Sequence, residues 1–260
     1  MIPLKDDNPT QSVPIVTVLL IIVCTAIYFF VQPGGSLAAS NATDKSVRDL
    51  RFTLDHAAIP CELVHGRPLT VDEIRQTLET GNKDACEAHP TSPSAFPAKR
   101  IYLAVLYSMF LHGSLLHLGG NMLFLWIFGN NIEDTVGKVG YLAFYLVAGL
   151  AAAGTYIALD PHGTVPIIGA SGAIAGVMGA YLVLFPNVRI RTLLIFYLIL
   201  IRDIRAKWLL LFWFALQFFT GPNSGVAWTA HVGGFIFGML AGMVLRAGGK
   251  GRRPALAPVW

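Results

Sequence analysis

The stretch Gly169-Ala-Ser-Gly-Ala-Ile-Ala-Gly-Val-Met-Gly179 places one hydroxyl at the start of an apolar segment. The segment from Ser171 to Phe185 spans roughly 22 Å as a helix, less than the ~30 Å hydrocarbon core of a bilayer. In a membrane, Ser171 is therefore expected below the surface. A helix start leaves the N–H groups of Ser171 and Gly172 free to stabilise an oxyanion. A lone Ser in an apolar helix is more often a packing residue, so a catalytic role needs support from other residues.

Composition indicates an all-α, multi-pass membrane protein. Hydrophobic residues make up 54% of the chain, charged residues 13%, and the mean hydropathy is +0.59,. The net charge of +4 comes from basic residues clustered between apolar runs and near the C-terminus, a pattern that marks membrane topology,. We therefore expect the lipid bilayer as a partner and no nucleic acid.

Residues 1–12 form a short polar leader, and residues 13–31 are long enough for a first transmembrane helix,. A cleaved signal peptide is the alternative, with Ser36 to Ser40 as its small-residue site, although the apolar core is longer than usual.

Residues 32–100 form a long polar loop or subdomain. Thr70 and Glu73 fit a capping box, and Gly81 can end the helix that follows,. Cys61 and Cys86 bracket this helix and would form a disulfide in an oxidising compartment, while two independent thiols remain nearly as consistent with the sequence.

Five further helices are expected, giving a six-helix bundle. The second helix is expected to begin after Ser114. The third to sixth helices are expected to cover Gly140 to Leu159, Ser171 to Phe185, Trp208 to about Thr220, and Thr229 to Arg246. Thr192 to Ile201 is apolar but too short to cross a membrane, so it is expected to be interfacial or re-entrant. Gly221 to Gly225 reads as a flexible loop.

The charges orient this bundle. Basic residues follow the fourth and sixth helices and predict that these ends and both termini are cytoplasmic: Arg189, Arg191, Arg202, Arg205, Lys207, Arg246, Lys250, Arg252 and Arg253,. Residues 247–260 are then a basic cytoplasmic tail, and the long loop is exterior. The second, fourth and sixth helices would all start at the outer face.

That orientation brings four separated polar residues to one depth: His117, Asn121, Ser171 and His231. Gly234, Gly238 and Gly242 recur every four residues, as do Ser171, Ala175 and Gly179. Stripes of small residues let helix backbones approach closely, as a Ser–His hydrogen bond requires,.

Three motifs together resemble the rhomboid intramembrane serine proteases: His112-x4-His117-x3-Asn121, Gly169-Ala-Ser-Gly172 and Ala230-His-Val-Gly-Gly234. The resemblance covers about Leu103 to Arg246, within a core assigned to residues 101–246. It implies a catalytic dyad, with Ser171 as nucleophile and His231 as base, and an oxyanion site formed by His117, Asn121 and the Ser171 backbone N–H. It also implies that His112 supports the outer loop and that Glu133 is a structural glutamate.

Two positions depart from the family pattern. Leu103-Ala104 stands where many members have Trp-Arg, and Ala175 stands where some have an aromatic residue that stacks on the histidine. Support for His231 must then come from elsewhere.

The sequence thus predicts an intramembrane serine endopeptidase, in the inner membrane of a bacterium, that cleaves transmembrane substrates near the outer face and uses neither a metal nor an organic cofactor. No HExxH motif and no transmembrane segment with two aspartates is present,. The alternatives are a non-catalytic rhomboid-like protein that binds transmembrane helices and a small transporter.

Overall fold

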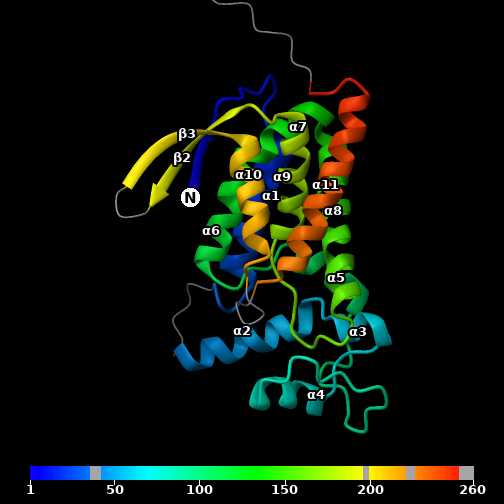
Figure 1. The fold of residues 1–260 in the computed structure, drawn as a ribbon. Coiled ribbons are helices and arrows are strands. Elements are labelled where there is room, and N and C mark those ends of the chain that lie inside the picture. The colour runs from blue at the N-terminus through cyan, green and yellow to red at the C-terminus, as the bar shows by residue number, and fades with distance from the viewer. Residues whose placement is uncertain (36–41, 196–198, 221–225, 252–260) are drawn as a thin grey trace, which may run out of the picture.

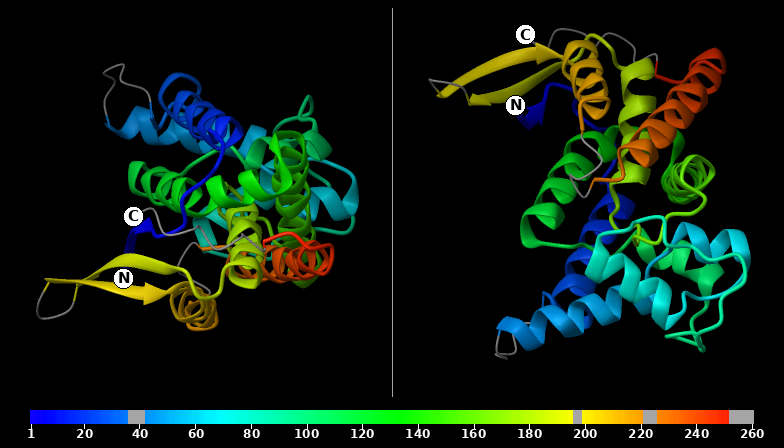
Figure 2. Two further views of the ribbon diagram at one scale, coloured as in Figure 1. Left: turned by 90° about the horizontal axis from the view of Figure 1, so that it is seen from above. Right: turned by 60° about the horizontal axis from the view of Figure 1, so that its bottom comes forward.

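The computed structural model describes residues 1–35, 42–195, 199–220 and 226–251. A helical bundle occupies its centre, with a sheet at one end and a small helical subdomain at the other (Figures 1 and 2). The helices of the bundle are α1 (Ile15–Ala26), α5 (Ile101–Ser108), α6 (Leu115–Phe124), α7 (Asn130–Val136), α8 (Lys138–Leu159), α9 (Ser171–Leu184), α10 (Ala206–Gln217) and α11 (Trp228–Ala247). Helix α1 continues into the π-helical turn Ile27–Val31, and α6 into Leu125–Gly129. The expected start after Ser114 is confirmed, because the Ser114 hydroxyl caps α6.

Helix α9 is the central element of the bundle. It contacts α8, α10, α11 and the π-helical turn after α6, and most of its residues are buried. The helix carries no charged residue, and its small side chains leave room for close neighbours,. The apolar, glycine-rich sequence of this segment therefore accounts for its position.

The prediction of an all-α fold is wrong in one respect, because the chain forms a three-stranded antiparallel sheet. Strand β1 (Ile2–Asp6) pairs with β2 (Arg189–Ile195), which pairs with β3 (Ile199–Arg205). The segment Thr192 to Ile201, expected to be interfacial or re-entrant, belongs mostly to this hairpin. Its β-branched and aliphatic residues suit strands, and residues of the leader provide the third strand.

The expected signal-peptide site at Ser36 to Ser40, the Gly221 to Gly225 loop, and Arg252 and Arg253 of the tail lie outside the described residues.

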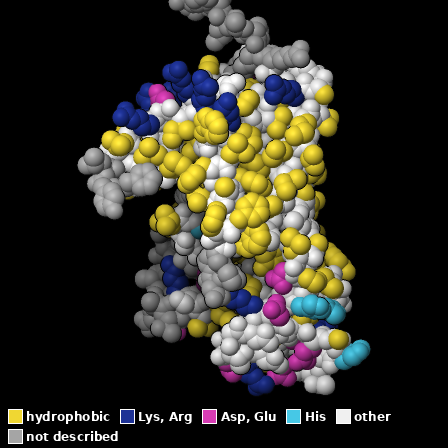
Figure 3. Space-filling model, viewed as in Figure 1, with side chains coloured by type: hydrophobic (Ala, Val, Ile, Leu, Met, Phe, Trp, Pro, Cys, Tyr) yellow, Lys and Arg dark blue, Asp and Glu magenta, His cyan; other side chains and the backbone are white. Residues whose placement is uncertain are grey.

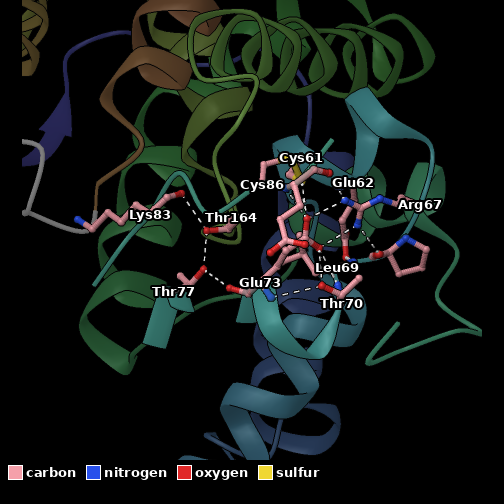
Figure 4. The surroundings of a disulfide bond; sticks show 12 residues. Cys61, Glu62, Arg67, Leu69, Thr70, Glu73, Thr77, Lys83, Cys86 and Thr164 are labelled. Atoms are coloured by element: carbon pink, nitrogen blue, oxygen red, sulfur yellow. Dashed lines mark hydrogen bonds and ion pairs between the residues drawn. A yellow bond between two sulfur atoms is a disulfide. The ribbon is translucent and has the colours of Figure 1, made fainter. Parts of the chain in front are cut away.

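Residues 42–100 contain the short helices α2 (Ala42–His56), α3 (Pro60–His65) and α4 (Val71–Arg75), which continues as the π-helical turn Gln76–Thr80. The Thr70 capping box is confirmed, and Gly81 ends the helix with a left-handed conformation. Cys61 and Cys86 form a disulfide (Figure 4), and Cys24 is a buried free thiol.

Buried charge pairs stabilise this subdomain beside the disulfide. Glu73 accepts two hydrogen bonds from the guanidinium of Arg67, at 2.7 and 2.8 Å. Burial raises the pKa of Glu73, but the bonds from Arg67 and from the backbone N–H groups of Glu87 and Thr70 outweigh it and lower the pKa to about 2,. A second carboxylate, Glu62, pairs with Lys99, and both are buried. Burial raises the pKa of Glu62 and lowers that of Lys99, and the ion pair opposes both shifts.

The subdomain is tied to the loop that precedes α9. Ile167 donates its N–H to the Ala58 carbonyl at 2.8 Å, and Cys61 donates its N–H to the Gly163 carbonyl at 3.0 Å. The hydroxyls of Thr77 and Thr164 lie 2.6 Å apart. The long polar segment is therefore packed against the chain that leads to Ser171.

The surface of the bundle is apolar between two charged ends. On the face drawn in Figure 3, hydrophobic side chains cover the bundle, Lys and Arg gather near the sheet, and mixed charges with histidines lie at the subdomain end. Within the described residues, Lys138–Leu159 and Trp228–Ala247 are long and apolar enough to cross a membrane. Shorter apolar helices cover Ile15–Val31, Ser171–Leu184 and Ala206–Gln217.

Candidate active site

A glycine positions the nucleophile candidate at the start of α9. Gly169 has a φ of +123°, and a β-carbon there would come within 2.8 Å of His117 Nε2. The residue must therefore be glycine for both conformational and steric reasons. Its N–H donates to the Ser108 carbonyl at 2.9 Å, which fixes the loop just before Ser171.

Glycines also bring α11 against α9. A β-carbon on Gly234 would collide with the Gly172 carbonyl, and one on Gly238 would collide with the Gly176 carbonyl. Backbones at this separation place side chains of the two helices within hydrogen-bonding distance of one another. The stripe of Gly234, Gly238 and Gly242 read from the sequence therefore lies at this contact. On α9 the predicted stripe is wrong in part: Gly179 meets α11, but the carbonyls that face Gly234 and Gly238 belong to Gly172 and Gly176 and not to Ser171 and Ala175.

Ser171 and His231 meet across this contact. His231 Nε2 lies 2.7 Å from Ser171 Oγ, within the range for a nucleophile and its general base,. The two residues are 60 positions apart in the chain. The structure therefore brings together the pair that the sequence analysis selected.

Two residues of α10 contact His231 and were missed in the sequence analysis. Gln217 Oε1 lies 2.8 Å from His231 Nδ1, and the Trp213 ring lies beside the imidazole with centroids 5.7 Å apart. These contacts support His231, which has Ala175 and not an aromatic residue at the position noted in the sequence. Gln217 is the lone uncharged polar side chain in the apolar run of α10, four residues after Trp213, and that isolation was the available signal.

Asn121 and His117 line one cavity together with Ser171 and His231. Asn121 Nδ2 is buried without a hydrogen-bond acceptor among the described residues. Gly113 donates its N–H to His117 Nδ1 at 3.4 Å, so in the neutral ring the proton is on Nε2, the atom that faces Gly169,. Two N–H donors thus remain available in the cavity that Ser171 lines.

The cavity has a volume of about 680 Å³. Its apolar walls include Phe124, Ile174, Met178 and Trp213, and no Asp, Glu, Lys or Arg lines the part that the structure describes. The space suits an apolar peptide segment, with polar groups concentrated near Ser171.

His112 lies outside this cavity lining and holds the segment before α6. Its N–H donates to Gln32 Oε1 at 2.9 Å, and Gln32 Nε2 donates to its carbonyl at 3.1 Å. The His112 ring also packs edge-on against His117, with centroids 5.3 Å apart. His112 therefore links the end of the first helical segment to the candidate oxyanion site.

Glu133 lies in α7, away from the cavity, and caps α1. Its carboxylate accepts the N–H groups of Val16 and Thr17 at 2.9 and 2.8 Å, and the Thr17 hydroxyl at 2.8 Å. A carboxylate at a helix N-terminus satisfies free donors and complements the helix dipole.

Among the described residues, potential metal-ligating side chains lie close together at one place, in the subdomain: Cys61, His65 and Cys86. The disulfide occupies both sulfurs, so this cluster offers no thiolate ligands,.

Comparison with known proteins places the part of the bundle from α5 to α11 in one family. A model of the rhomboid domain matches residues 99–248. Rhomboid protein 1, mitochondrial, of Saccharomyces cerevisiae is 36% identical over 92 residues, which are 34% of this chain and 27% of that protein. Presenilin-associated rhomboid-like protein, mitochondrial, of Homo sapiens is 35% identical over 97 residues, 36% of this chain and 26% of that protein.

A bacterial relative matches over a longer range. Rhomboid protease GluP of Bacillus subtilis is 29% identical over 175 residues, 66% of this chain and 32% of that protein. The chain spans about a third or less of the length of these three relatives.

Proposed function

The chain belongs to the rhomboid family and is therefore a helical membrane protein, and on that premise we propose that it is an intramembrane serine endopeptidase. The observation that carries the proposal is the 2.7 Å contact between Ser171 Oγ and His231 Nε2 at the edge of an apolar cavity. The similarity to a protein named a rhomboid protease supports the same activity.

In this mechanism Ser171 Oγ attacks the scissile carbonyl carbon while His231 Nε2 accepts the hydroxyl proton. The C=O π electrons move to the oxygen, and the resulting oxyanion takes hydrogen bonds from Asn121 Nδ2, His117 Nε2 and the Ser171 N–H. Gly172 contributes its small size and a free N–H in the same first turn.

Collapse of this intermediate breaks the C–N bond, and His231 gives its proton to the leaving amine. A water molecule, deprotonated by His231, then attacks the carbonyl carbon of the acyl-enzyme. Collapse of this second intermediate breaks the ester bond to Ser171 Oγ, which takes the proton back from His231, and the carboxylate product is released. Every proton transfer uses the imidazole, so the reaction needs no metal or organic cofactor.

The proposed substrate is a transmembrane helix cut near its outer end. A helix buries its carbonyls in its own hydrogen bonds, so Gly, Pro or other weak helix formers near the cut should favour cleavage.

We place six spans in the membrane: Ile15–Val31, α6 with α7, α8, α9, α10 and α11. The basic sheet end is proposed to be cytoplasmic, with both termini, and the subdomain exterior. A bacterial inner membrane remains our proposed location, because the relative with the longest match of the three is bacterial, although the other two are mitochondrial.

The test is labelling of detergent-solubilised protein with a serine-directed fluorophosphonate, paired with cleavage of a transmembrane substrate. Wild-type protein should label and cleave, whereas Ser171→Ala and His231→Ala should do neither while remaining folded. Folded wild-type protein that never labels would instead favour a rhomboid-like protein that binds helices without cutting them.

A further inference from the structure

His231 is held on two sides, and only one of its partners is the nucleophile. Nε2 faces Ser171, while Nδ1 lies 2.8 Å from Gln217 Oε1 at the C-terminal end of α10. The Gln217 residue is only 7% exposed, so water does not readily replace this contact.

The orientation of the Gln217 amide follows from its second hydrogen bond. Its nitrogen donates to the Trp213 carbonyl at 3.0 Å, and a carbonyl can only accept,. The amide oxygen must then point at His231, and because this oxygen is only an acceptor, His231 Nδ1 must carry the proton.

A neutral imidazole has one protonated nitrogen. With the proton on Nδ1, the lone pair of Nε2 faces Ser171 Oγ, as a general base requires. We infer that Gln217 is a positioning residue that fixes the tautomer and the orientation of His231. The site is thus a Ser–His–Gln arrangement rather than the isolated dyad expected from the sequence.

The surroundings favour a neutral partner in this position. Among the described residues that line the cavity, His117 of α6 is the other titratable side chain facing His231, and α9, α10 and α11 contribute no charged side chain there. A carboxylate would have to be desolvated in this apolar setting, whereas an amide supplies the same acceptor without a charge. A carboxylate would also stabilise the protonated imidazole, so a charged substitute should change the pH dependence of the reaction.

This inference rests on the proposed protease function, and its test compares fluorophosphonate labelling rates across pH in Gln217 variants. Gln217→Met keeps the length but removes the acceptor, and should slow labelling about 10-fold, the loss expected for one hydrogen bond to the imidazole. Gln217→Glu keeps the acceptor and should label, with the acid limb of its pH profile moved to higher pH. Thr220→Val is the control on the same helix end, because the Thr220 hydroxyl bonds the Leu216 carbonyl instead.

A structural role alone would not move the pH profile. Gln217→Met with wild-type labelling, or Gln217→Glu with an unshifted profile, would overturn the assignment. If wild-type protein does not label at all, the protease function fails first. Nitrogen-15 NMR of histidine-labelled wild-type protein provides a second measurement that needs no variant to fold: it should show His231 protonated on Nδ1, and a proton on Nε2 would refute the inference.

Discussion

Gly238 of α11 lies directly against the backbone carbonyl of Gly176 in α9. Gly176 follows Ser171 along α9, and Gly238 follows His231 along α11. The contact between the two glycines therefore sets the separation at which the side chains of Ser171 and His231 meet. A side chain of any size at Gly238 must push the two helices apart.

Gly238→Ala should therefore lower the free energy of unfolding by about 1 to 3 kcal/mol and slow fluorophosphonate labelling of Ser171. Gly154→Ala in α8 is the matched control, because a β-carbon there has no atom within 4 Å. Unfolding in a detergent titration measures the first effect. Equal stability of the two variants would contradict the close-packing explanation.

Asn121→Ala should reduce turnover of a transmembrane substrate by about 2.7 to 4 kcal/mol of activation free energy, because one oxyanion donor is lost. Steady-state kinetics in micelles separates kcat from KM. The neighbouring change Met122→Leu preserves volume and serves as the control. A change in KM alone would mean that Asn121 positions substrate and does not stabilise the oxyanion.

Glu133→Ala should lower the free energy of unfolding by about 2 to 4 kcal/mol, because it leaves two backbone N–H groups and the Thr17 hydroxyl without their acceptor,. Asp134→Ala is the comparison, since its bonds to Gln11 and Ser12 are exposed and should matter less,. Denaturant titration of both variants checks the order. If Asp134→Ala lowers the free energy of unfolding more than Glu133→Ala does, Glu133 is not the main cap of α1.

Acid should loosen the subdomain of residues 42–100 through Glu73. The pKa of Glu73 is about 2 in the folded protein, against the usual 4.5 that applies to the unfolded chain. The carboxylate therefore stabilises the fold fully above about pH 4.5, and this contribution is lost as the pH falls through 2,. The shift corresponds to a contribution on the order of 3 kcal/mol.

Hydrogen exchange of residues 60–99, corrected for the intrinsic effect of pH, should show this loss. Glu73→Gln should weaken protection already at pH 7, whereas the exposed Glu79→Gln should not. Protection that is unchanged in Glu73→Gln would show that its carboxylate does not stabilise the subdomain.

Topology can be tested with an impermeant maleimide on intact cells, using a Cys24→Ala background that retains the disulfide. His162→Cys, in the exposed turn beside the subdomain, should label directly. Lys250→Cys should label only after the membrane is permeabilised. The opposite result would reverse the proposed orientation and place the active site near the cytoplasmic face.

Local patterns predicted much of this structure. The Thr70 capping box, the start of α6 after Ser114 and the glycine contacts between α9 and α11 all depend on residues within one or two turns of a helix. Ser171 and His231 were selected because each heads a helix, and antiparallel alternation of spans places those ends together.

What the sequence did not reveal depends on distant partners. Residues 189–205 contain strand-forming residues, but the strand that completes their sheet is Ile2–Asp6, far away in the chain. Gln217 stood out as a polar residue, yet its role depends on how α10 is rotated about its axis relative to His231. Neither spacing nor composition specifies that rotation.

The register of the sheet, in which Ile2 pairs with Leu193, also fixes an order of events during biosynthesis. A ribosome must translate almost two hundred residues, including α9 and its serine, before β1 has a partner. Non-local pairing of this kind forms late, because a long loop must first be closed. Protection of residues 2–6 would therefore report that β1 has joined the sheet, and a nascent chain arrested before residue 189 should leave them open to proteolysis.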